Sequence, residues 1–76
     1  MLDDNVLSIL NNIADSIKEA GLDPYEQLYG YATTGNELYI TRHGDAREQV
    51  KNLRIEDITA FLHHELKHYK KVSKVQ

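Results

Sequence analysis

The chain has 76 residues, a net charge of −3 and no cysteine. This length fits a single domain over residues 1–76. The lack of cysteine excludes disulfides and thiolate zinc sites, and the acidic balance provides none of the basic footprint of a nucleic-acid-binding protein. No apolar run approaches the roughly 20 residues of a membrane span, and no charged segment followed by an apolar stretch opens the chain. We therefore expect a cytoplasmic protein without membrane contact.

The first predicted helix covers residues 3–20. Its apolar residues recur at helical spacing on one face, at Val6, Leu10, Ile13, Ile17 and Ala20. Asp3 or Asp4 is expected to cap its N-terminus, and Gly21 fits the left-handed position that ends many helices.

The second predicted helix runs from Pro24 to about Thr33. Asp23 is a good N-cap, and proline is favoured at the first helical position. Gly30 stands in the middle of this helix, where glycine costs about 1 kcal/mol relative to alanine. We interpret Gly30 as a position of close packing, by another helix or by Tyr31.

An irregular connector, TTGNELYITRHGD, follows the second helix. Two glycine-containing turn signals bound a short stretch with β propensity, which is too short for a strand. We expect an ordered connector that packs Leu38, Tyr39 and Ile40 inward.

Two more helices are predicted after the connector. Asp45 is expected to cap a third helix from Ala46 to about Leu53, and a fourth runs from about Ile55 to Lys70, with residues 72–76 frayed. The fold class is therefore all-α, a small compact domain of about four helices. Because so small a domain buries only about 60% of its unfolded surface, we expect its stability to be supplemented by oligomerisation or by a metal.

The fourth helix contains His64-Glu65-Leu66-Lys67-His68, the H-E-x-x-H pattern of zinc hydrolases. A third zinc ligand is not marked out, and the chain leaves little material for a substrate cleft, so a zinc hydrolase is the remote alternative. Adventitious binding of zinc or nickel by His64 and His68 stays open. On the helical wheel Glu65 falls near the apolar stripe, where its carboxylate would need a partner. We expect no catalytic residue and no cofactor.

Two other groups of side chains are notable. Arg42, His43, Asp45 and Arg47 gather around one turn. They either bind a phosphate or a phosphorylated partner, or form local structure in which Asp45 caps and Arg47 pairs with Asp45 or Glu48. Four of the five tyrosines cluster in the middle of the chain, where they suit either a partner interface or ordinary core packing.

The middle segment, GLDPYEQLYGYATTGNELYITRHGDAREQV, resembles the signature of the IreB-like family of small proteins from low-GC Gram-positive bacteria. The matching positions are Gly21, Pro24, Gln27, Gly30, Tyr31, Gly35, Tyr39, Ile40, Asp45, Ala46 and Arg47. Within the connector, Glu37 replaces the proline of the signature. We take Gln27, Gly30, Tyr31, Tyr39, Arg42, Asp45 and Arg47 as residues of the signature or of a partner interface.

The resemblance implies an all-α homodimer that regulates without enzymatic activity, in cell-envelope signalling by a transmembrane Ser/Thr kinase and its phosphatase. It also implies that Gly30 permits close helix contact, Asp45 caps, and Arg47 holds the connector by hydrogen bonds. The family's phosphoacceptor threonines precede the first helix, and this chain has no threonine there, so the phosphosite does not carry over. Ser8, Ser16, Thr33, Thr34, Thr41 and Thr59 remain as acceptors.

A DNA-binding module is the alternative function. Short helices joined by turns can form a helix-turn-helix, and the third predicted helix and its end carry Arg47, Lys51 and Arg54. The acidity of the chain argues against it.

Overall fold

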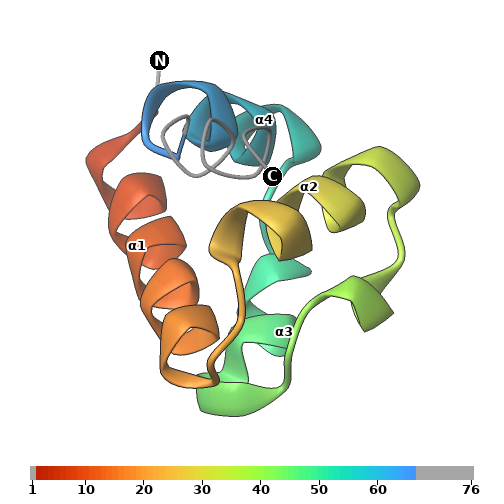
Figure 1. Ribbon diagram of the computed structural model, residues 1–76. Helices are drawn as coiled ribbons and strands as arrows, with labels where there is room; N and C mark the ends of the chain where they lie inside the picture. Colours follow the sequence, from red (N-terminus) through yellow and green to blue (C-terminus); the bar gives the residue numbers. More distant parts are fainter. Residues whose placement is uncertain (1, 67–76) are drawn as a thin grey trace, which may run out of the picture.

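A computed structural model describes residues 2–66 of the chain. This part folds into four α-helices and two short 3-10 turns, with no strand among the described residues (Figure 1). The elements are α1 (Asp4–Glu19), α2 (Pro24–Thr34), η1 (Glu37–Tyr39), η2 (His43–Asp45), α3 (Ala46–Val50) and α4 (Ile55–His64). The all-α prediction is confirmed. Within the described part, no helix has the length and apolar character needed to cross a membrane.

Helix α1 begins where its sequence predicts. The Asp3 side chain accepts a hydrogen bond from the backbone N–H of Asn5 at 3.2 Å and so caps the helix. The helix ends at Glu19, and Gly21 follows with a left-handed φ of 81°. Ala20 lies beyond the last turn and is exposed, so its predicted place on the apolar face is wrong.

One apolar core joins the four helices. Its buried members are Leu10, Ile13, Ala14, Ile17, Leu28, Tyr31, Ile40, Ala46, Val50, Ile58, Phe61, Leu62 and Leu66. No polar or charged residue is buried among residues 2–66. The hydrophobic effect therefore holds the helices together without buried ion pairs or polar networks.

Helix α2 is capped at both ends by its own sequence. Asp23 accepts a hydrogen bond from the Tyr25 N–H at 2.9 Å, as predicted. The helix extends to Thr34 and is stopped by Gly35, whose φ is 74°. The chain then turns back along the outside of α2 toward α3 (Figure 1).

The connector packs only one of its three predicted residues inward. Ile40 is fully buried, whereas Leu38 is 70% exposed and Tyr39 is 47% exposed. The reason is local: η1 is a 3-10 turn capped by the Asn36 side chain, and successive side chains of so tight a turn point in different directions.

Helix α3 is shorter than predicted and is not capped by a side chain. It ends at Val50, not near Leu53. Asp45 has a left-handed backbone, φ 62°, and its side chain makes no capping hydrogen bond. An N-cap residue normally has extended dihedrals that turn its oxygen toward the first helical N–H groups, so this backbone explains why the predicted cap is absent.

Helix α4 ends at His64, inside the H-E-x-x-H sequence. The N–H groups of Glu65 and Leu66 both donate to the Phe61 carbonyl, and the chain leaves the helix there. Glu65 is exposed, so its predicted place near the apolar stripe is wrong and it needs no buried partner. The predicted continuation to Lys70 and the predicted fraying of 72–76 lie outside the described residues.

Candidate functional site

The connector is held by two side chains that bind the same peptide unit. Gln27 Oε1, from α2, accepts a hydrogen bond from the Thr41 N–H at 2.8 Å. Arg47 Nε, from α3, donates to the Ile40 carbonyl at 2.8 Å. Because this carbonyl and this N–H belong to one peptide bond, the two helices fix its plane from both sides. We call this arrangement the connector clamp.

The connector clamp supplies the hydrogen bonds that a neighbouring strand would otherwise provide to an extended segment. Ile40 has the extended dihedrals of a strand, φ −106° and ψ 130°, but the described residues include no strand that could pair with it. A backbone N–H or C=O next to a buried side chain must find a partner or destabilise the fold. Gln27 and Arg47 supply these partners, which confirms that Arg47 holds the connector by a hydrogen bond.

Gly30 lets the connector approach α2 closely. A Cβ atom built on Gly30 would lie 2.8 Å from the Tyr39 Cγ and Cε1 atoms, well inside van der Waals contact. The residue packed on Gly30 is therefore Tyr39 of the connector, not Tyr31, which is buried in the core instead. Tyr31 is thus a core residue and lies away from the surface formed by Tyr39.

Tyr39 borders a surface groove, here called the tyrosine groove. It has a volume of about 490 Å³ and is lined by Glu26, Gln27, Tyr29, Gly30, Thr33 and Tyr39. Tyr29 is 52% exposed and stacks on Tyr25, with ring centroids 5.8 Å apart and an interplanar angle of 12°. This groove is therefore lined by two half-exposed tyrosines, Tyr29 and Tyr39, each of which packs against a neighbouring residue.

Sequence reasoning missed Glu26 and Thr33 as residues of this groove, and it did not single out Tyr29 among the four clustered tyrosines. Their signal is the helical spacing 26, 29, 30 and 33, which places them on one outward stripe of α2 together with Gly30. This stripe is not apolar, so a search for core periodicity passes over it.

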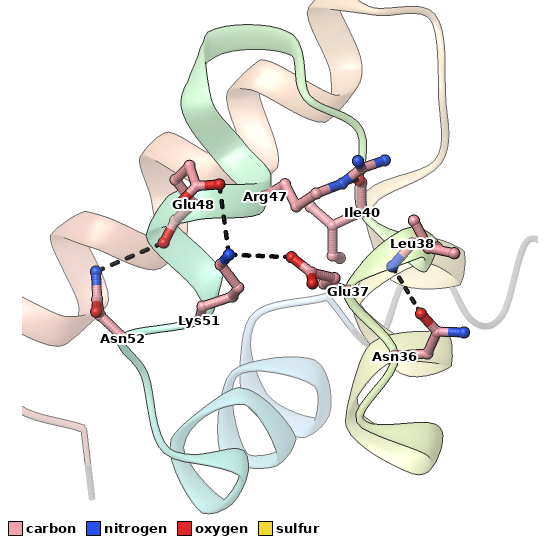
Figure 2. Close-up of polar contacts among 8 residues, drawn as sticks. All are labelled: Asn36, Glu37, Leu38, Ile40, Arg47, Glu48, Lys51 and Asn52. Carbon is pink, nitrogen blue, oxygen red and sulfur yellow. Dashed lines mark hydrogen bonds and ion pairs between the residues drawn. The ribbon is translucent and has the colours of Figure 1, made fainter.

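A second hollow lies on the other side of the connector. It is lined by Glu37, Leu38, Arg42, Asp45, Arg47 and Glu48. The predicted pairing of Arg47 with Asp45 or Glu48 is wrong, since Arg47 reaches over Ile40 to its carbonyl (Figure 2). Arg42 and Asp45 are exposed in this hollow, and neither side chain makes an ion pair within the described part of the chain.

Lys51 ties the connector to α3. Its Nζ lies 3.1 Å from Glu37 Oε1 and 3.4 Å from Glu48 Oε2, between the two carboxylates (Figure 2). The hydrogen bond to Glu37 and the charges of Glu37 and Glu48 raise the pKa of Lys51 above its ordinary value of 10.5. Glu37, which replaces the proline of the family signature, thus has a structural partner in this chain.

The cations expected of a DNA-recognition helix are already engaged. Arg47 binds the Ile40 carbonyl, Lys51 binds two carboxylates, and Arg54 lies 3.6 Å from Glu56. Helix α3 itself has only 5 residues. This surface offers little to a phosphate backbone, which is recognised mainly through free lysine and arginine side chains.

Helix α4 ends at the first histidine of the H-E-x-x-H sequence. Two histidines at i and i+4 face one way only on a continuous helix, and α4 ends at His64. His68 lies outside the described residues. Among residues 2–66, no group of three or more histidine or acidic side chains is arranged to hold a metal ion.

The family comparison agrees with the resemblance seen in the sequence. The model of the family described as "IreB regulatory phosphoprotein" matches residues 2–70. This match spans nearly the whole 76-residue chain. The chain belongs to the IreB family, and this membership indicates a regulatory role.

Proposed function

We propose that this protein is a homodimeric, non-enzymatic regulator that acts through protein contacts in signalling by a Ser/Thr kinase and its partner phosphatase. The family membership supports the regulatory part of this proposal. The kinase, the phosphatase and the second copy of the chain are the proposed partners.

The observation that carries the proposal is the exposure of large apolar side chains on and beside a connector whose backbone is hydrogen-bonded to two helices. Leu38 and Tyr39 are exposed on η1, and the exposed Tyr29 lines the same groove as Tyr39. The connector clamp fixes the backbone that carries Leu38 and Tyr39. Exposed aromatic side chains of fixed position bind partners with little loss of conformational entropy.

Three polar side chains around the connector have structural partners. Gln27 and Arg47 bind backbone groups, and Lys51 bridges two carboxylates.

The dimer is tested by sedimentation velocity of the full chain at micromolar concentrations. We expect twice the monomer mass, and we expect Leu38→Ser to weaken the association. Ile9→Ser is the matched control, since Ile9 is an exposed apolar residue on α1. A monomer at all concentrations would refute the homodimer.

The signalling role is tested with the cytosolic parts of the host's Ser/Thr kinase and phosphatase. We expect calorimetric binding to one of them, and phosphorylation by the kinase at an exposed hydroxyl. Ser8, Thr33, Thr34 and Thr59 are exposed, whereas Ser16 and Thr41 are half-buried. Absence of both binding and phosphorylation would refute this part of the proposal.

A further inference from the structure

We propose that the tyrosine groove binds an arginine side chain of a protein partner. This inference rests on the proposed function, because it names the chemistry by which such a partner would be recognised. Three features support it: two fixed aromatic rings, an unpaired carboxylate, and the acidity of the chain.

The aromatic rings are held in place before any partner binds. The Tyr39 ring lies against Gly30, and the connector clamp fixes the backbone next to it. The Tyr29 ring stacks on Tyr25. Because Tyr29 and Tyr39 both remain about half exposed, part of each side chain is available to a ligand without rearrangement.

Glu26 supplies the charge at this groove. Its carboxylate is exposed and makes no hydrogen bond or ion pair within residues 2–66. None of the described residues that line the groove is a cation. A positively charged side chain entering between the tyrosines would therefore meet an unpaired carboxylate.

Arginine fits this combination better than other side chains. A planar guanidinium stacks on aromatic faces, where the ring electrons attract its charge, and it can also donate two hydrogen bonds to one carboxylate. Lysine offers a more strongly hydrated point charge without the stacking surface. An acidic or phosphorylated side chain would be repelled by Glu26.

The acidity of the chain favours a cationic partner. The chain has twelve acidic side chains against nine lysines and arginines and carries a net charge of −3. Such a field increases the rate at which a basic segment meets the domain.

The direct test is an NMR titration of the full isotope-labelled chain with N-acetyl-arginine-methylamide. The uncharged isostere N-acetyl-citrulline-methylamide is the control ligand. We expect saturable shifts at Tyr29, Gly30 and Tyr39, and at least about threefold weaker binding of citrulline. Equal shifts from both ligands, or shifts centred elsewhere, would overturn the proposal.

Substitutions at Tyr29 and Glu26 separate the contribution of the aromatic ring to arginine binding from that of the carboxylate. Tyr29→Leu and Glu26→Gln are each expected to weaken arginine binding about two- to fivefold. Tyr29→Phe keeps the aromatic face and should bind as the wild type does. Asp15→Asn removes an exposed carboxylate from α1 and should have no effect. Unchanged binding by Tyr29→Leu and Glu26→Gln would refute the groove as the site.

This test can fail independently of the proposed function. If the chain forms dimers or binds the kinase or phosphatase but does not distinguish arginine from citrulline, the groove assignment is wrong and the regulatory function stands. If arginine binds in the groove but the chain is monomeric and engages neither enzyme, the groove stands and the proposed function is wrong.

Discussion

Gln27 and Arg47 bind the two polar groups of a single peptide bond. Gln27 accepts from the Thr41 N–H and Arg47 donates to the Ile40 carbonyl, each at 2.8 Å. Helices α2 and α3 are thus both hydrogen-bonded to the same peptide group of the connector. The surface that the connector presents depends on both contacts.

Replacing Arg47 by methionine should destabilise the domain. The Ile40 carbonyl would lose a charge-assisted hydrogen bond in a part-buried position, at a cost of about 1.5–3 kcal/mol. Chemical denaturation of the two proteins measures this difference. Arg54→Met is the control, because Arg54 is exposed and pairs only with Glu56. Equal stabilities of the two variants would contradict the role assigned to Arg47.

Replacing Gln27 by methionine should cost about 1–3 kcal/mol, because the Thr41 N–H would be left without an acceptor. Gln27→Glu keeps an acceptor oxygen at this position and should retain most of the stability. Combining Gln27→Met with Arg47→Met should cost less than the sum of the two, since both variants release the same peptide unit. Strict additivity would argue against one shared clamp.

Gly30→Ala should destabilise the domain although alanine is the better helix former. The new methyl group would overlap the Tyr39 ring, at a cost of about 1–3 kcal/mol, which exceeds the gain in helix propensity of about 1 kcal/mol. In a Tyr39→Leu background the same change should be neutral or stabilising. Thermal denaturation of the four proteins tests this, and an equal cost in both backgrounds would show that Tyr39 is not the obstacle.

Asp45 should tolerate glycine better than serine. Its left-handed backbone, φ 62°, costs about 1 kcal/mol for most residues but nothing for glycine. Asp45→Gly should therefore be about as stable as the wild type, and Asp45→Ser should lose about 1 kcal/mol. Serine is a good N-cap residue, so full stability of Asp45→Ser in urea denaturation would instead support a capping role.

The contribution of Lys51 should disappear at high pH. Because Glu37 and Glu48 raise its pKa above 10.5 in the folded state, the folded chain holds this proton more tightly than the unfolded chain does. The stabilisation is complete below pH 10.5 and is lost as the pH rises through the folded-state pKa. Melting temperatures of the wild type and Lys51→Met should differ at neutral pH and converge in strong alkali. Any difference in melting temperature between the wild type and Arg54→Met should persist in strong alkali, because arginine keeps its charge at that pH.

The helices were predictable because their signals are local. The apolar period of α1, the Asp23 cap of α2 and Gly35 at its end act within a few residues, and the structure follows them. Helix α3 differs, since its predicted cap depended on the backbone of Asp45. A left-handed residue other than glycine is rare, and no residue near Asp45 indicates one.

The site was less predictable because it depends on contacts distant in sequence. Gln27 and Thr41 are 14 positions apart, and neither residue type indicates a partner. Family resemblance marked Gln27 and Arg47 as signature residues, but only the folded chain shows that they meet at one peptide bond. The inward packing of Leu38 and Tyr39 was wrong because apolar character alone does not decide which residues of a tight turn are buried.

The acceptor of the Thr41 amide is a side chain 14 residues away in the sequence. The amide belongs to no helix, yet its hydrogen is held by a side chain of α2 in a part-buried position. Such a hydrogen exchanges with solvent only when the structure opens locally. The exchange rate of this one amide therefore reports how often the connector separates from α2, and hence how long the surface around Tyr39 keeps its shape.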